Sequence, residues 1–410
     1  MKIWFLFFIV LPVYSSTYSE VLIELADSDV ELVSRKNYLE YYSATKLAGF
    51  GRFLPKFTLT SSQNKNKIEE QTETETKTNS MSLSMNVFSF GEDLFHLRST
   101  SNMYESEVQA VEFQRLSTYQ SISELLFEYI KVKNAIEIRN EIIDLKDKSY
   151  QIAKKRFQLG KLAKHDYQKV GIDLNNTQAQ LENDRISLRT IEASLANYGN
   201  VHDLELKWPW ENQVDKMEKV LENNLQIENH PSFQHANLDY DAKDYSQKSV
   251  VASFLGDISI SLTQSRISDL DSNDEIDDKR FMISYSIPLF NNFIDYANYK
   301  KAVADKYNQQ TKLLNTKRYL EKSFNNQKEI LKSSIRTYRL RVQTLKLSQD
   351  LYQHTLKQFR NGRLSVNELI LDQDRLLQTK ILANAGSASL HQSMVQYCTS
   401  LGKDILRNCF

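Results

Sequence analysis

The side chains with the clearest potential for chemistry lie in two similar segments far apart in the chain. RFQLGKLAKHDY covers residues 156–167, and QFRNGRLSVNEL covers residues 358–369. Each has a phenylalanine, a glycine three residues later, a basic residue next, and a carboxylate six residues past the glycine. The carboxylates are Asp166 and Glu368. Acids in such a place could attract cations, pair with nearby arginines, or simply cap a helix and solvate a turn.

Other reactive residue types form no pattern that an enzyme would need. The seven histidines make no H-E-x-x-H motif, and the chain has no P-loop, dinucleotide-binding glycine motif or G-x-S-x-G. His165, beside Asp166, could be a pH sensor or an ordinary exposed residue. The acidic stretch at 266–279 could hold a divalent cation, but it lacks the glycine and closing glutamate of an EF-hand loop, which favours a solvated loop. We expect no enzymatic activity and no catalytic residue, metal or cofactor.

Composition limits the possible partners and the kind of fold. Charge is balanced, with 52 basic and 52 acidic residues, so we expect no nucleic-acid partner. Only 10 glycines and 5 prolines occur, which favours long uninterrupted elements. Cys398 and Cys409 are the two cysteines. They could form a disulfide in an oxidising compartment or remain as two thiols.

The N-terminus has the pattern of a secretory signal. Lys2 precedes an apolar run over residues 3–13, and small residues follow, so we predict a signal peptide over residues 1–16. No later apolar run approaches the ~20 residues that a membrane-spanning helix needs. If this exported protein enters a membrane, we expect it to do so with strands.

The two halves of the chain contain the same sequence pattern. Aromatic and aliphatic residues recur every seven positions before each glycine, and the second set stands 202 residues after the first. A sustained seven-residue repeat predicts helices packed along a coiled-coil seam. The two sets are Ile122, Tyr129, Ile136, Ile143, Tyr150 and Phe157, then Phe324, Leu331, Tyr338, Leu345, Tyr352 and Phe359.

These repeats predict two long helical hairpins. The first covers about 92–197 with its tip near residue 160, and the second about 293–400 with its tip near residue 362. The longer arm of each measures roughly 100 Å at 1.5 Å per residue. Gly160 and Gly362 provide the left-handed backbone that such a reversal needs.

Each long helix follows two predicted strands. Apolar residues alternate with serine and threonine over about ten residues, the pattern of outer-membrane strands; a half-exposed hairpin on a soluble domain is the alternative. The expected strands are 52–62, 80–90, 253–265 and 280–290, with polar loops at 64–79 and 266–279. Four strands are too few to close a barrel, and lipid tolerates no open sheet edge, so other copies of the chain must complete the sheet.

Together these features resemble the TolC-like outer-membrane efflux protein family. The resemblance covers nearly the whole chain after the signal peptide. Its most specific parts are the two tips, IPLFNN at 287–292, and LENNLQIENHPSFQHANLDY at 221–240. It gives this division: signal peptide 1–16, first repeat 17–200, connecting equatorial segment 201–230, second repeat 231–402, C-terminal tail 403–410.

The resemblance implies a mainly α fold with a β-barrel contribution. Three chains would form a 12-stranded barrel in the outer membrane of a Gram-negative bacterium, continued by a helical tunnel across the periplasm. Such a homotrimer is a passive exit duct for efflux or type I secretion. Its implied partners are outer-membrane lipid, a periplasmic adaptor and an inner-membrane transporter.

The resemblance also assigns the tips to the tunnel entrance. Asp166 and Glu368 match the acids of the two hairpins, and three copies of Glu368 around one axis would favour cations. The family often has a further acid where this chain has Leu371, and Asp372, one residue further on, is the candidate substitute. A basic residue of the family is replaced by Leu364, which leaves Arg360 and Arg363 as partners for Asp166. The rival interpretation is a periplasmic coiled-coil adaptor or scaffold without a barrel.

Overall fold

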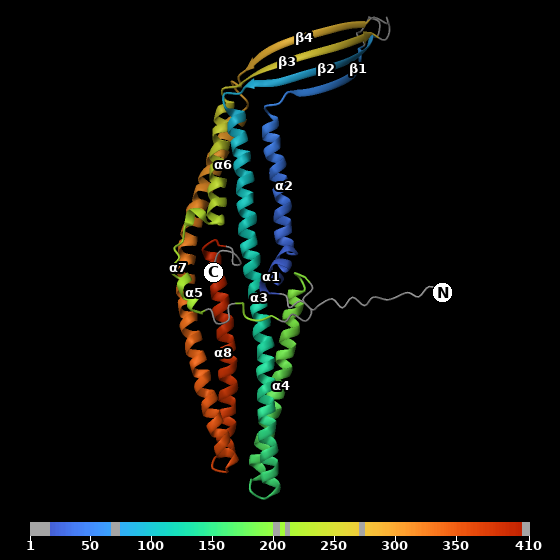
Figure 1. The fold of residues 1–410 in the computed structure, drawn as a ribbon. Coiled ribbons are helices and arrows are strands. Elements are labelled where there is room, and N and C mark those ends of the chain that lie inside the picture. Colours follow the sequence, from blue (N-terminus) through green and yellow to red (C-terminus); the bar gives the residue numbers. More distant parts are fainter. Residues whose placement is uncertain (1–16, 67–73, 200–205, 210–213, 270–274, 404–410) are drawn as a thin grey trace, which may run out of the picture. The chain divides into compact units, whose positions relative to one another are not determined.

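The structure is a computed structural model that describes residues 17–66, 74–199, 206–209, 214–269 and 275–403. The predicted signal peptide and Cys409 lie outside the described residues. Figure 1 shows the order of the elements along the chain. The helices and strands are α1 Tyr18–Asp27, α2 Val30–Gly51, β1 Lys56–Asn66, β2 Thr74–Phe88, α3 Glu92–Gln158, α4 Lys164–Leu195, α5 Val214–Val220, η1 Ile227–Asn229, α6 Pro231–Ser253, β3 Asp257–Asp269, β4 Glu275–Ser286, α7 Ile294–Arg360 and α8 Val366–Ser400.

Two helical hairpins dominate the chain. The long arms α3 and α7 have 67 residues each, and the return arms α4 and α8 have 32 and 35. Each return arm runs back beside its long arm (Figure 1). Phe324, Leu331, Tyr352 and Phe359 of the second heptad set are buried, because the seven-residue repeat keeps one stripe of α7 against its neighbours.

The four strands form one antiparallel sheet in the order β1-β2-β3-β4. Its register aligns residues of one kind across the strands. Leu83 pairs with Phe57 on one side and with Leu262 on the other, and Ser82 with Thr58 and Thr263. One face is therefore apolar and the other rich in hydroxyl groups. Gly256, with φ +78°, immediately precedes β3. A Cβ at this position would lie 1.9 Å from the Ser286 backbone oxygen, so only glycine fits.

The predicted strand positions were wrong by several residues. We expected strands at 52–62, 80–90, 253–265 and 280–290, but each described strand is displaced toward the polar connection that it shares with its partner. The segments 64–66, 74–79, 266–269 and 275–279, expected in loops, belong to the strands. The backbone ladder pairs 64–66 with 74–76 and 266–268 with 275–277, because backbone hydrogen bonds need no apolar face; only 74–79 also has threonines, which suit a strand. Residues 67–73 and 270–274 lie outside the described part.

Helices α1, α2 and α5 were missing from the prediction, and α6 extends beyond the segment 221–240 that carries the resemblance. α2 and α6 lie where the chain has no heptads, and they precede β1 and β3 at equivalent places in the two repeats. A signal for α1 was available: Thr17 stands three residues before Glu20, and its backbone N–H donates to Glu20 Oε2 at 2.9 Å, as in a capping box.

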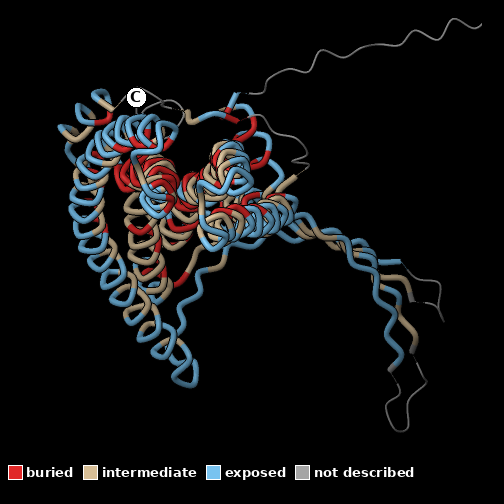
Figure 2. Tube along the Cα trace, turned by 90° about the horizontal axis from the view of Figure 1, so that it is seen from below, coloured by how far each residue is buried: buried red, intermediate tan, exposed pale blue. Residues whose placement is uncertain are grey.

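The chain forms two compact units, and each contains parts of both repeats. One comprises the described parts of Met1–Val33, Phe113–His230 and Leu320–Phe410, and the other those of Ser34–Glu112 and Pro231–Tyr319. The first holds two apolar cores, one around Ile122 and Tyr397, the other around Tyr352 and Phe359. The second holds the sheet, and no described strand residue is buried (Figure 2). Within the described residues, no helix has the length and apolar character needed to cross a membrane.

Candidate functional site at the hairpin tips

The tip between α3 and α4 is a helix end closed by glycine. Gly160 has φ +66°, and its N–H donates to the Phe157 carbonyl at 2.9 Å, while Lys161 N–H donates to the Arg156 carbonyl at 2.8 Å. This pair of bonds is a Schellman motif, which satisfies carbonyls that the last turn of α3 would leave open. Gly160 therefore has the predicted role in the turn.

The tip between α7 and α8 repeats this geometry. Gly362 has φ +76°; its N–H donates to the Phe359 carbonyl at 2.9 Å, and Arg363 N–H donates to the Gln358 carbonyl at 3.0 Å. Both glycines adopt the left-handed conformation in which a Cβ is disfavoured.

Glu368 caps the helix that follows this turn. Its Oε2 accepts hydrogen bonds from Ser365 N at 3.1 Å and Ser365 Oγ at 2.9 Å, and its own N–H donates to Ser365 Oγ at 3.3 Å. This is a complete capping box at the start of α8. The negative charge of Glu368 remains exposed beside the tip.

The other acids predicted for the entrance have partners close in the sequence. Asp166 Oδ1 lies 3.1 Å from His165 Nδ1. Asp372 accepts a hydrogen bond from Thr355 Oγ1 at 2.5 Å and lies 2.7 Å from Arg375 Nη1, with its side chain only 13% exposed.

The arginines predicted as partners of Asp166 do not pair with it within the chain. Arg360 and Arg363 are both exposed, and among the described residues only the His165 ring lies within ion-pairing distance of the Asp166 carboxylate. A link from Asp166 to Arg360 or Arg363 therefore stays a prediction for an assembly of chains.

Arg156 connects the two tips, a role that the sequence did not reveal. From the end of α3 its Nη2 donates to the Phe359 carbonyl at 2.6 Å and to the Arg360 carbonyl at 3.2 Å. Its guanidinium also lies 4.7 Å from the centre of the Phe359 ring. Arg156 thus neutralises the carbonyl end of α7, where the helix dipole favours a cation.

The two tip phenylalanines occupy different environments. Phe359 is completely buried, whereas Phe157 is 37% exposed and stacks on Tyr167, with ring centres 5.3 Å apart. The heptad prediction treated them as equivalent seam residues. The repeat is therefore preserved in the backbone of the tips but not in the packing of these two rings.

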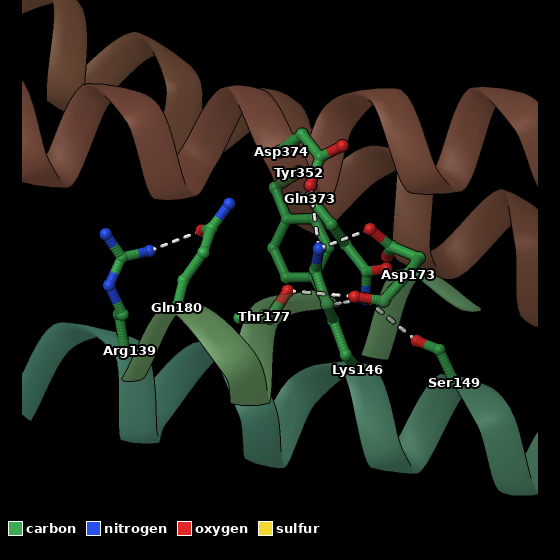
Figure 3. Close-up of polar contacts among 9 residues, drawn as sticks. All are labelled: Arg139, Lys146, Ser149, Asp173, Thr177, Gln180, Tyr352, Gln373 and Asp374. Atoms are coloured by element: carbon green, nitrogen blue, oxygen red, sulfur yellow. Dashed lines mark hydrogen bonds and ion pairs between the residues drawn. The ribbon is translucent and has the colours of Figure 1, made fainter. Parts of the chain in front are cut away.

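Further from the tips, a buried lysine joins the two hairpins. Lys146 on α3 is 1% exposed, and its Nζ lies 2.7 Å from Asp173 of α4 and 2.7 Å from Asp374 of α8. Figure 3 shows this cluster between the helices. Burial raises the pKa of Asp173 despite the attraction of Lys146. One cation thus holds carboxylates from both hairpins.

A second polar bridge lies at the same level. Gln373 of α8 donates from Nε2 to Ser149 Oγ on α3 at 2.9 Å, and lies 3.4 Å from the Tyr352 hydroxyl of α7 (Figure 3). Burial raises the pKa of Tyr352, which keeps this hydroxyl neutral. A polar residue at Gln373 in an otherwise apolar seam was the available sequence signal.

The chain thus combines two long helical hairpins with charged tips and a sheet with one apolar face. In agreement with this, the sequence model of the family "Outer membrane efflux protein" matches residues 46–200. The predicted resemblance to TolC-like outer-membrane efflux proteins is therefore confirmed. The family is one of outer-membrane efflux proteins, which agrees with the predicted location in the outer membrane.

Solved channel structures share the fold over nearly the whole chain. CusC aligns with a TM-score of 0.81 and 14% identity, covering 94% of this chain and 92% of CusC. VceC of Vibrio cholerae gives 0.79 and 13%, covering 94% and 96%. CmeC of Campylobacter jejuni, an outer membrane channel, gives 0.78 and 16%, covering 93% and 86%. No match was found among the curated proteins.

Proposed function

We propose that this protein is the outer-membrane exit duct of a tripartite efflux or type I secretion system. The observation that carries the proposal is the alignment of apolar residues in register across one face of the sheet. Leu59, Leu262, Phe281 and Ile283 are between 52% and 74% exposed. A sheet with so much apolar surface, which no other element of the described residues covers, requires a non-aqueous environment or a partner.

The edges of the sheet support the trimer. β1 and β4 have one strand neighbour each within the described chain. Open edges are not tolerated in lipid, and three copies supply the twelve strands of a closed barrel if β4 of each pairs with β1 of the next.

The hairpins would then form a tunnel whose entrance lies at the tips. Three copies of Glu368 would form a negative ring there, because its charge is exposed beside the tip. Asp166, Asp372, Arg360 and Arg363 belong to the same proposed entrance. Such a ring would hinder anions and favour cations.

The duct needs other proteins to deliver its cargo. A periplasmic adaptor and an inner-membrane transporter are proposed as partners, because the duct has no energy source of its own. The matching family is one of efflux proteins, and CmeC, which shares the fold, is an outer membrane channel. Both findings support a role in export.

Membrane fractionation followed by unheated SDS gels tests the proposal. The full chain should appear in the outer-membrane fraction and run as a trimer that boiling converts to a monomer. A soluble periplasmic monomer would contradict the duct and favour the adaptor or scaffold.

A further inference from the structure

A cavity beside the sheet is lined by apolar and charged side chains that the proposed duct function does not use. It measures about 380 Å³ and lies among α3, α6 and α7, within the unit that carries the sheet. A cavity of this size is within the range of small-molecule sites. Its lining residues are Phe90, Phe95, Asp244, Gln247, Lys248, Val251, Ala252, Leu255 and Lys306.

The lining is divided into an apolar end and a charged end. α6 ends at Ser253 and β3 begins at Asp257, so Val251 and Leu255 lie next to the sheet. Asp244 and Lys248 lie one to two turns further from it along α6. Phe90, just before α3, and Phe95, in its first turn, add aromatic surface at the sheet end.

The charged end has one more cation than anion. Lys248 Nζ lies 2.7 Å from Asp244 Oδ2, and Lys306 Nζ lies 2.6 Å from Asp244 Oδ1. Although burial opposes its ionisation, hydrogen bonds from both lysines hold the pKa of Asp244 below its ordinary value. The hydrogen bond to Asp244 raises the pKa of Lys306. Each lysine ammonium has three donors, and Asp244 occupies one of them on each lysine, so both can bind a further anion.

We propose that this cavity binds one anionic phospholipid, with its phosphate on Lys248 and Lys306 and its acyl chain against Phe90, Phe95, Val251 and Leu255. The orientation rests on the proposed function, which puts the sheet in the membrane. The acyl chain then points toward the bilayer and the headgroup toward the periplasm, as in a lipid of the inner leaflet. Basic pockets at a membrane boundary recognise anionic headgroups in this way.

Native mass spectrometry of the full-length protein in detergent tests the site. Phosphatidylglycerol should bind in preference to phosphatidylcholine with the same chains. Lys248→Gln/Lys306→Gln should weaken phosphatidylglycerol binding about tenfold or more, because two charge-assisted hydrogen bonds are lost. Lys312→Gln/Lys317→Gln removes two exposed lysines of α7 outside the cavity and should leave binding unchanged.

Asp244→Asn provides a test that misfolding cannot imitate. It removes the carboxylate that competes for both lysines, so phosphatidylglycerol should bind more tightly than to the natural protein. Equal binding of the two lipids, or unchanged binding after Lys248→Gln/Lys306→Gln, would overturn the proposal. Displacement by millimolar inorganic phosphate alone would also overturn it, because an anion without an acyl chain would then suffice.

The same preparations separate this proposal from the duct. A heat-modifiable outer-membrane trimer without lipid preference would contradict the proposed lipid site but not the proposed duct. A soluble monomer would contradict the proposed duct.

Discussion

Glu368 has two roles, a helix cap and a charge of the proposed ring, and different substitutions distinguish them. Its carboxylate completes the capping box with Ser365, and its charge would form the proposed ring. Glu368→Gln should keep the cap, since glutamine also serves in a capping box, and should lower the cation preference measured as a reversal potential in planar bilayers.

Ser365→Ala is the matched control for this change. It removes the cap but keeps the charge, so it should cost about 1 kcal/mol of unfolding free energy without altering the reversal potential. An unchanged reversal potential in Glu368→Gln would mean that Glu368 serves only as a cap.

The second prediction at the residue scale concerns Lys146. Lys146→Met would leave Asp173 and Asp374 without their shared cation, and should lower the free energy of unfolding by about 2 kcal/mol. This is less than for a fully buried ion pair, because the Asp374 side chain is 53% exposed. Urea unfolding followed by circular dichroism should show the loss. Lys148→Met changes an exposed lysine on the same helix and should alter stability by less than about 0.5 kcal/mol. Equal midpoints for the two variants would show that Lys146 does not hold the hairpins together.

His391 predicts a pH dependence of stability. It is buried on α8, with its ring centre 4.9 Å from that of Trp208, and burial lowers its pKa from 6.5 to about 4. The unfolded chain then binds the proton more readily. The contribution of His391 is full above about pH 6.5 and is lost as pH falls toward 4, a difference of about 3 kcal/mol.

The measurement is the urea midpoint of the natural protein and of His391→Gln between pH 7 and pH 4. The variant should lose less stability on acidification, whereas His354→Gln, which changes an exposed residue, should follow the natural protein. Parallel curves for all three proteins would contradict the assignment to His391.

These residue contacts show the limit of prediction from the sequence. The glycine turns could be predicted because the motif that forms them is local. Arg156 and Lys146 could not, because their partners across the hairpins, Phe359 and Asp374, lie 203 and 228 residues away. Nothing in the sequence indicates which charged residues of two long helices meet.

At the scale of elements, the left-handed conformation of the tip glycines predicts that alanine destabilises the chain more at the tip than at the end of a helix. Gly362→Ala should cost about 1 kcal/mol, since a Cβ is disfavoured at φ +76°. Gly51→Ala places a Cβ in open space at the end of α2 and should cost nothing measurable. Unfolding free energies from urea titrations provide the check, and an equal effect at the two positions would contradict the role of the turn.

The accuracy of the predicted elements depended on the type of signal. α3, α4, α7 and α8 were predicted within a few residues, because heptads and glycines mark both their faces and their ends. The strands were displaced, because their outer thirds are polar on both faces and alternation no longer marks them. α2 and α6 lack heptads, and α2 also exposes many apolar side chains, such as Leu47 at 70%.

At the scale of the whole molecule, the duplication explains why two units contain parts of both repeats. Each repeat passes through the sheet-bearing unit and the hairpin-bearing unit in turn. The sequence predicts the duplication, but not the ion pairs of Lys146 that connect the two hairpins. The proposed closure of the sheet by other copies rests on its open edges and exposed apolar face, and the proposed duct depends on that closure.

The conductance of the purified full-length protein in a planar bilayer tests the duct most directly. A trimeric duct should produce discrete conductance steps whose reversal potential shows cation preference and whose size is the same from one insertion to the next. Protein that runs as a heat-modifiable trimer yet gives no steps under any applied voltage would contradict the account.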